Sequence, residues 1–458
     1  MTDESLAHRL IEHCNQPVDA SLLQRARLHL LDWMGCVYGA AREEQAQILK
    51  TALLASVDHH TGDTPSFGLG RLNFDAAFTY STALGNVLEM DDLARTAIVH
   101  AGPVVVPAAL YTALQSNSNY ADLLLALVRG YEAAIRLGNS LDAYHYQRWH
   151  PTSTAGVAGA AIACAAIRKL DSTQQLAALC NALSVSGGLW HTRHGNSMTK
   201  QWHSVHTART GMSAVQSALY GFTAAEDIIE GEQGWHQVLA ANPSAEEIVK
   251  AADWAILQTS FKPWPACRHC HAAIDAALKL ARQLNGALQN VSDIAIDAYK
   301  DAQIFCDKVN PGTPAEARFS LQHSVAVALC NGTVQPADFE TEALQSAKIV
   351  KLRKITTVNN CSRLTANYPA HFGATVTIKL NDGQIIRQEI TDAMGDPEWP
   401  LDTEQIRGKF DMLCDWGVGD RSFNNTGVGG NNRTNELAEA VLHAPGDIKM
   451  SELLKSAL

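Results

Sequence analysis

The sequence predicts a mainly α-helical protein with a large all-helical domain and a smaller α+β domain. Apolar side chains recur at helical spacing through residues 1–265, in segments rich in alanine. After this point the pattern changes to alternating, β-branched segments that are typical of strands. Helical spacing returns over the last part of the chain. We therefore expect residues 1–265 and 398–458 to form the helical domain, and residues 266–397 to form the α+β domain.

The first helices are predicted from apolar spacing and from residues that cap helix ends. Ser21–Tyr38 has apolar positions at helical spacing behind a serine N-cap. Ser172 and Gln175 have the spacing of a capping box. Small residues such as Gly156 and Gly159 would let helices approach closely. Further helices are expected at 43–56, 75–88, 104–115, 120–137, 153–170, 172–186 and 199–223.

The α+β part is predicted from alternation and from one strong turn signal. Asn381-Asp382-Gly383 is typical of the turn of a β-hairpin, so the segments on either side should pair. Strands are expected at 255–260, 291–299, 351–358, 374–380 and 384–391, with helices at 272–284 and 314–330. Two more helices are expected in the C-terminal part, at 403–414 and 435–442.

Composition excludes several classes of protein. The 458 residues are 46% hydrophobic and 18% charged, as in ordinary globular proteins. A net charge of −11 argues against a general nucleic-acid binder or a binder of acidic membranes. The N-terminus does not resemble a signal peptide, and no stretch is long and apolar enough to span a membrane. The ten cysteines are scattered, which predicts reduced thiols in a cytoplasmic protein.

An acidic cluster followed by a histidine marks the first candidate site. Glu89, Asp91 and Asp92 lie within four positions, and His100 precedes a Gly102-Pro103 break. At a helix end, Glu89 and Asp92 would share a face and Asp91 would point elsewhere. Unpaired carboxylates are costly to bury, and a histidine near carboxylates suits proton transfer. The alternative is a set of helix-terminal acids beside a loop histidine.

Two further candidates lie at predicted helix starts. His150 directly precedes an Ala/Gly-rich helix, where free backbone N–H groups can bind an anion; a loop histidine without a task is the alternative. Lys200, His203 and His206 are spaced three apart and share a helix face. Zinc binding is disfavoured because no H-E-x-x-H motif or third ligand accompanies them, and a solvated face is the alternative.

The stretch from Lys262 to His271 is dense in basic residues and lies at the predicted domain boundary. Clefts between domains often hold ligand sites, so Lys262, Arg268 and His271 are candidates for carboxylate binding. A solvated basic linker is the alternative. Cys267–His271 also matches the C-x-x-C-H signature of c-type haem, which we reject because export signals are missing. Structural thiols are the default interpretation.

Two other segments carry weaker signals. His323 enters an apolar helix and, taken alone, would more often be a core or surface residue than a catalytic one. The glycine-rich segment Gly427–Asn431 lacks the lysine of a P-loop and is expected to be a loop.

Together these stretches resemble the MmgE/PrpD family. The matching motifs occur in family order: Asp91-Asp92 followed by His100, H-P-T-S-x-x-G at 150–156, the Lys200 helix, Glu230-Gly231 with Gly234, Lys262-Pro-x-Pro with His271 and Asp275 beyond, and Phe319-Ser320-Leu321. The resemblance implies a helical domain, an α+β lid, an active site in the groove between them, homodimers, and chemistry without metal or organic cofactor. Known family activities are dehydration of 2-methylcitrate, decarboxylation of cis-aconitate and epimerisation of iminodisuccinate.

The resemblance also implies site residues. Carried over by position, the site would contain Glu89, Asp91, Asp92, His100, His150, Lys200 and Lys262. The sequence departs from the family pattern at three places, with Glu89 for aspartate, Leu93 for threonine or serine and His323 for tyrosine, and it has Cys267 where the decarboxylases of the family have a histidine.

We therefore expect a cofactor-independent lyase, similar to 2-methylcitrate dehydratase, that removes a proton next to a carboxylate of a small di- or tricarboxylate. His100 or His150 would be the general base, and His323 or a carboxyl group such as Glu89 or Asp91 would assist the leaving group. Substrate binding is expected from Lys200, Lys262, Asp92, Arg268 and His271, with Lys200, Lys262 and Arg268 binding the carboxylates. A decarboxylase, an epimerase and a non-catalytic carboxylate-binding relative remain alternatives.

Overall fold

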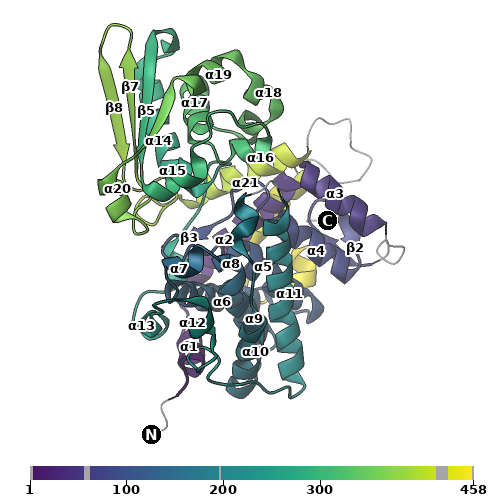
Figure 1. Cartoon of the computed structure of the whole chain (residues 1–458). Coiled ribbons are helices and arrows are strands. Elements are labelled where there is room, and N and C mark those ends of the chain that lie inside the picture. The colour runs from purple at the N-terminus through teal and green to yellow at the C-terminus, as the bar shows by residue number, and fades with distance from the viewer. Residues whose placement is uncertain (1–3, 56–61, 195–196, 419–431, 456–458) are drawn as a thin grey trace. The chain divides into compact units, whose positions relative to one another are not determined.

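The computed structural model describes residues 4–55, 62–194, 197–418 and 432–455. The chain divides into two compact units. Unit 1 comprises Met1–Val87, Asp91–Thr259 and Asp402–Leu458, and unit 2 comprises Leu88–Met90 and Ser260–Leu401. Figure 1 shows the helices of unit 1 from purple to teal and in yellow, and the strands of unit 2 in green. The prediction of a mainly α protein with a smaller α+β part is confirmed.

Unit 1 is built from long helices whose apolar faces form its core. The N-terminal and C-terminal helices meet within this unit, since α2 packs on α21 and α22. Its longer helices are α1 (Leu6–Cys14), α2 (Ala20–Ala40), α3 (Glu44–Leu54), α4 (Phe74–Leu84), α5 (Gly102–Gln115), α6 (Tyr120–Asn139), α9 (Gly156–Ile167), α10 (Ser172–Ser184), α11 (Thr199–Leu219), α21 (Thr403–Val418) and α22 (Asn432–His443). Shorter helices are α7 (Ala143–Tyr146), α8 (Pro151–Thr154), α12 (Trp235–Leu239), α13 (Ala245–Val249) and α23 (Met450–Leu453).

Glycines bring α6 and α9 into backbone contact at the centre of unit 1. A Cβ on Gly159 would lie 2.6 Å from the carbonyl oxygen of Gly130, and one on Gly130 would lie 2.8 Å from that of Gly159. Such distances are far below van der Waals contact, so no larger residue fits at either position without moving a helix. The close approach expected from Gly159 therefore occurs, and Gly130 is its partner.

Two predicted helix caps are wrong by one or two residues. α2 begins at Ala20, and its N-cap is Asp19, whose Oδ1 accepts from the backbone N–H of Ser21 at 2.8 Å and of Leu22 at 3.0 Å. The capping box of α10 likewise joins Asp171 to Gln174 rather than Ser172 to Gln175. Aspartate precedes serine in both places, and its carboxylate is the stronger acceptor at a helix N-terminus.

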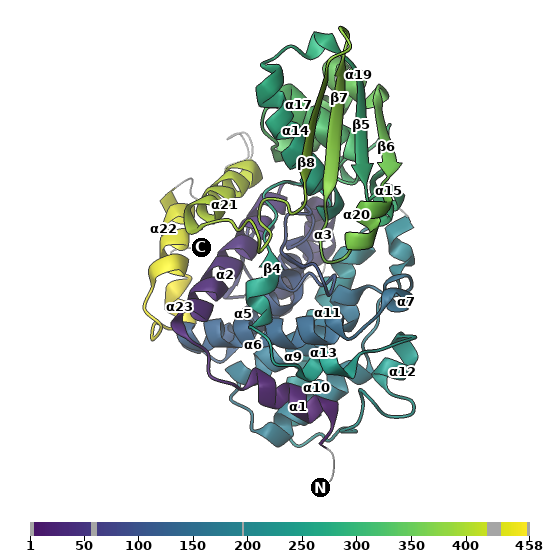
Figure 2. The same ribbon diagram turned by 90° about the vertical axis from the view of Figure 1, so that its left-hand side faces the viewer.

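Unit 2 contains a four-stranded sheet in the order β6-β5-β7-β8. The strands are β5 (Val291–Ala298), β6 (Thr356–Asn360), β7 (Ala374–Leu380) and β8 (Ile385–Ile390). β6 is parallel to β5, whereas β5, β7 and β8 are antiparallel neighbours. α14 (His271–Leu284) packs on β7 and β8, and α17 (Leu321–Asn331) packs on α14 (Figure 2). The remaining helices are α15 (Lys300–Cys306), α16 (Pro314–Ala317), α18 (Thr341–Gln345), α19 (Ala347–Lys354) and α20 (Ser362–Asn367).

The hairpin predicted at 381–383 joins β7 to β8, but three other predictions fail in part. Residues 351–354 belong to α19, and the strand begins only at Thr356. Residues 255–258 form a 3₁₀ turn before the two-residue strand β4 (Thr259–Ser260). The helix predicted at 314–330 is interrupted, because Ser320 leaves the helical conformation and caps α17 by accepting from the His323 N–H.

No helix among the described residues is both long and apolar enough to cross a membrane. The glycine-rich segment 427–431 lies outside the described residues.

Candidate active site

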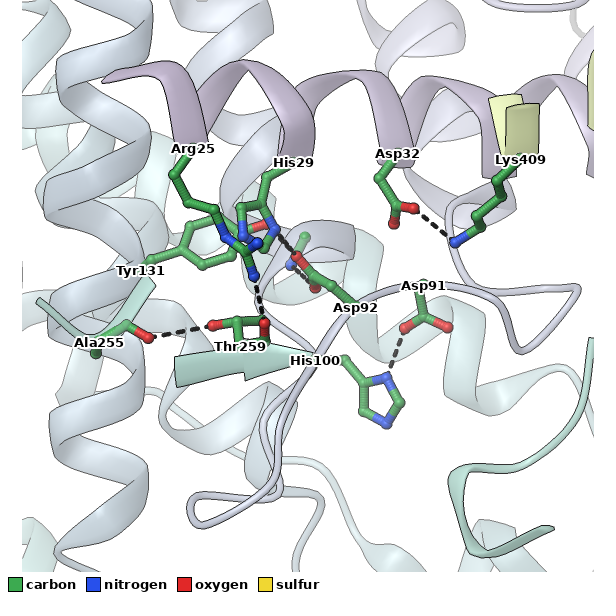
Figure 3. Close-up of polar contacts among 11 residues, drawn as sticks. Arg25, His29, Asp32, Asp91, Asp92, His100, Tyr131, Ala255, Thr259 and Lys409 are labelled. Atoms are coloured by element: carbon green, nitrogen blue, oxygen red, sulfur yellow. Dashed lines mark hydrogen bonds and ion pairs between the residues drawn. The ribbon is translucent and has the colours of Figure 1, made fainter. Parts of the chain in front are cut away.

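The loop between α4 and α5 carries the first group of predicted site residues. Asp91 to Gly102 folds back on itself, with Ala94 and Val99 exchanging backbone hydrogen bonds of 2.9 and 3.3 Å. His100 Nδ1 donates to Asp91 Oδ2 at 2.6 Å (Figure 3). Its backbone N–H donates to Thr152 Oγ1 at 3.0 Å. The imidazole of His100 is thus held by a carboxylate next to the start of α5.

The prediction that Glu89 and Asp92 share a helix face is wrong. α4 ends at Leu84, and Glu89 has a positive φ of 55°, which ends any helical path to Asp92. Asp91 and Asp92 belong to unit 1, whereas Glu89 belongs to unit 2, where its Oε2 lies 4.0 Å from Lys262 Nζ. The three carboxylates therefore have different partners.

Asp92 is buried and accepts three hydrogen bonds from unit 1. Its Oδ2 accepts from His29 Nδ1 at 2.6 Å and from the Tyr131 hydroxyl at 2.5 Å, and its Oδ1 accepts from the Gly102 N–H at 2.8 Å. Burial raises the pKa of Asp92, but the hydrogen bond from His29 and those from Tyr131 and Gly102 bring it below its ordinary value. Asp92 is therefore an ionised carboxylate, and both of its oxygens accept hydrogen bonds from unit 1.

His150 is buried at the N-cap of α8, and its ring stacks on Trp190 with centroids 4.2 Å apart. Its Nδ1 lies 3.2 Å from Nδ1 of His203. Its Nε2 is buried and has no hydrogen-bond partner among the described residues. Burial lowers the pKa of His150 well below its ordinary value, and the charges of Lys200, His203 and His100 lower it further. His150 is therefore a neutral imidazole.

The N-terminal turns of α11 complete this group. Lys200 and His203 lie one turn apart, and both act on the pKa of His150. His206, on the next turn, is exposed. The structure thus brings together Asp91, His100, His150 and Lys200. From the sequence, His203 was interpreted as a solvated or zinc-binding residue. Its spacing of three from Lys200 was the signal that could have placed the two side chains on the same side of the helix.

The basic segment of unit 2 is buried, so the alternative of a solvated linker is wrong. Lys262, Arg268 and His271 are each at most 3% exposed. The Arg268 guanidinium pairs with the buried carboxylate of Asp396. His271 Nε2 donates to the Ala266 carbonyl at 3.0 Å. Within unit 2, the ammonium group of Lys262 lies 4.0 Å from the Glu89 carboxylate.

The loop after β8 fixes the Lys262 segment inside unit 2. Asp396 accepts from the Ser260 hydroxyl at 2.6 Å and from the Ala393 N–H at 3.0 Å, and it also holds Arg268. The Phe261 N–H donates to the Gly395 carbonyl at 2.9 Å. Gly395 has a φ of +93°, and a Cβ there would lie 2.0 Å from the Phe261 carbonyl oxygen. Arg268 is therefore a structural partner of Asp396 in this conformation.

Cys267 is buried with two other thiols, those of Cys270 and Cys306. A hydrogen bond with Cys306 lowers the pKa of Cys267, against burial and the charge of Glu89, which raise it. Cys270 also bonds to Cys306. The three cysteines are free thiols, in agreement with the structural interpretation of the C-x-x-C motif.

His323 is buried in unit 2, and its Nε2 donates to the Asp338 carbonyl at 2.8 Å. Burial lowers its pKa to about 4, so the imidazole is neutral at ordinary pH. Its ring lies edge-on to Phe339. A group with so low a pKa is a poor proton donor near neutral pH, which weakens the role expected for His323.

Among the described residues, two groups have side-chain atoms placed as metal ligands would be: Glu4, His8 and Glu12, and His371, Asp392 and Glu398. Neither contains a predicted site residue. The His203–His206 pair is not part of either group.

Buried neutral histidines predict loss of stability in acid. Burial lowers the pKa to about 4 for His29, His145 and His323, against 6.5 in an exposed histidine. Between these values the unfolded chain binds more protons than the folded one, so stability falls as pH falls. Each histidine should contribute a slope of about 1.4 kcal/mol per pH unit. Urea midpoints measured at about pH 7 and about pH 5 should fall clearly toward acid; equal midpoints would contradict these protonation states.

Comparisons with known proteins place the chain in a family. The MmgE/PrpD N-terminal domain model matches residues 4–248, and the C-terminal domain model matches residues 264–425. The cis-aconitate decarboxylase of Mus musculus is 25% identical over 417 residues, covering 86% of this chain and 83% of that protein. The 2-methylcitrate dehydratase of Salmonella typhimurium is 30% identical over 128 residues, 26% of each chain. That of Cupriavidus necator is 29% identical over 154 residues, 32% of this chain and 31% of the relative.

The two family models together span most of the sequence, and the motifs around Asp91, His150 and Lys200 fall within the first of them. The chain belongs to the MmgE/PrpD family.

Proposed function

We propose that the protein is a lyase that removes a proton next to a carboxylate of a small di- or tricarboxylate. The observation that carries this proposal is the cluster of two differently held imidazoles, His100 and His150, beside the ammonium group of Lys200. Acid–base chemistry needs a neutral imidazole within reach of the proton, and a polyanion needs a cation nearby.

His100 is suited to be a base because of Asp91. The carboxylate accepts the Nδ1 proton, so the lone pair lies on Nε2, and the imidazolium formed after proton transfer is stabilised by the same carboxylate. Asp91 thus has an orienting role in the proposed mechanism.

His150 is the second candidate base. When its Nδ1 donates to Nδ1 of His203, its lone pair lies on Nε2, which has no partner among the described residues. The low pKa of His150 keeps the ring neutral, although it also makes the ring a weaker base than an exposed imidazole. Two imidazoles allow one to take the proton and the other to assist departure of the leaving group.

Lys200 would bind a substrate carboxylate and stabilise the enolate-like charge that builds on it as the proton leaves. Such charge is larger in the transition state than in the ground state, so the ammonium group accelerates the step rather than only tightening binding. We assign Lys262, with Glu89 beside it, a second carboxylate-binding role in unit 2.

Dehydration and decarboxylation differ in what happens after the same polyanion is bound. Dehydration needs a proton for the departing hydroxyl group. The imidazolium formed in the first step can donate that proton. Decarboxylation needs a proton delivered to carbon after CO₂ leaves. The mouse cis-aconitate decarboxylase matches over most of both chains, so decarboxylation, in which an imidazolium would deliver the proton, is the second candidate; the dehydratases match over about a quarter to a third.

The proposal is tested by NMR in deuterated water with 2-methylcitrate, citrate, cis-aconitate and iminodisuccinate as substrates. We expect one acid to lose water or CO₂. Exchange of the hydrogen next to the carboxylate without loss of either would favour an epimerase instead. Thermal stabilisation by one of the acids with no product and no exchange would indicate a non-catalytic binding protein, and no response to any of them would refute the proposed substrate class.

A further inference from the structure

We propose that Asp92, His29 and Tyr131 form a buried positioning unit that fixes His100, and that Asp92 is a positioning residue rather than a substrate ligand. The proposal deepens the proposed function and rests on it, since it concerns the imidazole assigned to proton transfer. None of these three side chains contacts the reacting atoms in this scheme; they act through the loop that carries His100.

The loop is closed by three successive cross-links. Asp91 binds the His100 ring at 2.6 Å, Ala94 and Val99 pair through their backbones, and Asp92 Oδ1 accepts from the Gly102 N–H at 2.8 Å. Each cross-link joins the stretch before the turn at residues 95–98 to the stretch after it. Because His100 lies between Val99 and Gly102, its position depends on both flanking links.

Asp92 ties this closed loop through its side chain to two of the long helices of unit 1. Its Oδ2 accepts from His29 on α2 at 2.6 Å and from Tyr131 on α6 at 2.5 Å (Figure 3). The rings of His29 and Tyr131 also touch, with centroids 4.7 Å apart. One carboxylate therefore connects α2, α6 and the first residue of α5.

Burial makes this connection specific. Asp92 is 2% exposed, and His29 and Tyr131 are fully buried. A buried carboxylate is tolerated only where donors surround it, so there is one arrangement of the loop that satisfies the charge. Burial lowers the pKa of His29 to about 4, and burial with the charge of Asp92 raises that of Tyr131 well above its ordinary value. Both donors are therefore neutral and keep their protons near neutral pH.

Gly102 shows how closely the loop is fitted to Asp92. A Cβ at this position would lie 2.8 Å from Asp92 Oδ1 and 3.1 Å from its Cγ. The carboxylate cannot retreat without losing His29 or Tyr131, since both hold it from the other side. A side chain at position 102 would therefore displace Asp92 or the loop.

The first test is Tyr131→Phe, which removes one oxygen and keeps the ring. Loss of one donor to Asp92 should let the loop shift, and small misplacement of a catalytic group costs rate rather than affinity. We expect kcat on the substrate found above to fall by about tenfold to about 10²-fold while KM stays within about twofold. The matched control is Tyr111→Phe, another fully buried tyrosine of unit 1 whose hydroxyl bonds to Pro65, Ala77 and Ser81 away from the loop.

The second test compares two replacements of His29. Asparagine places an amide N–H near the position of the imidazole Nδ1 and can still donate to Asp92, whereas leucine cannot. We expect His29→Leu to lose kcat and His29→Asn to recover at least part of it. Equal kcat loss in both variants at equal folding stability would mean that the ring only fills space.

Hydrogen exchange separates this proposal from the proposed function. Amides of Ala94 and Val99 should exchange at least about tenfold faster in Tyr131→Phe than in the wild type, and remain protected in Tyr111→Phe. If the wild type acts on no polycarboxylate, the proposed function fails, but exchange in the loop still decides whether Asp92 is anchored by Tyr131. Unchanged kcat together with unchanged loop exchange in Tyr131→Phe would overturn the positioning unit.

Discussion

Replacing either His100 or His150 with alanine is expected to lower kcat by about 10²–10⁴-fold, the usual contribution of a positioned acid or base. The His100→Ala variant lacks the imidazole that Asp91 orients. The His150→Ala variant lacks the buried Nε2 that has no hydrogen-bond partner among the described residues. The measurement is kcat and KM on the substrate identified by NMR. KM should change less than kcat because the ammonium groups that bind carboxylates remain.

A matched control is available on α11. His206→Ala removes an exposed imidazole one turn from His203 and should leave kcat unchanged. Because His150 stacks on Trp190 and its loss leaves a cavity, His150→Gln should be measured beside His150→Ala, with thermal unfolding of each variant. Full activity in both alanine variants would remove the proposed mechanism.

Replacing Lys409 with methionine is expected to destabilise the protein by about 3–5 kcal/mol, because it leaves the buried Asp32 carboxylate without its partner. Lys409 Nζ on α21 lies 2.6 Å from Asp32 Oδ1 on α2, and both side chains are at most 4% exposed. Burial raises the pKa of Asp32 to about 6 even though Lys409 lowers it, which shows how costly this carboxylate is to bury. Figure 3 shows the pair on the same side of α2 as His29.

The effect should be much smaller where solvent screens the charges. Lys250→Met breaks an ion pair with Glu247 whose side chains are 42% and 29% exposed, and should cost no more than about 1 kcal/mol. The double variant Asp32→Leu/Lys409→Met removes both buried charges and should recover most of the loss. Urea unfolding of the four proteins tests this; a cost below about 1 kcal/mol for Lys409→Met would contradict a buried pair.

The spacing of apolar residues was sufficient to predict much of the fold, because many helices and strands carry local sequence signals. The turn residues 381–383 and the alternation on either side predict β7 and β8 closely, and β5 follows from the same pattern. The failure at 351–354 lies at the boundary between two elements. These residues, Lys-Leu-Arg-Lys, carry no β-branched side chain and end α19, where Leu352 and Arg353 are buried; the β-branched run of the strand starts only at Ile355.

The site was predictable only as a set of residue types, since its geometry depends on distant partners. Asp92 meets His29 across 63 residues of sequence, and Asp32 meets Lys409 across 377. Neither His29 nor Lys409 lies in a motif, so no local signal could identify them. The positive φ of Glu89 likewise separates residues that a helical interpretation placed on one face. The motif residues His100, His150 and Lys200 were recognisable because each stands at a predicted helix start.

The most direct test of the central claim is a crystal structure of the protein with tricarballylate, a tricarboxylate that has no hydroxyl group to lose. We predict a carboxylate of the ligand within hydrogen-bond distance of Lys200 Nζ, with Nε2 of His100 or His150 facing the C–H group next to that carboxylate. Tricarballylate bound away from these side chains, or absent at saturating concentration, would contradict it.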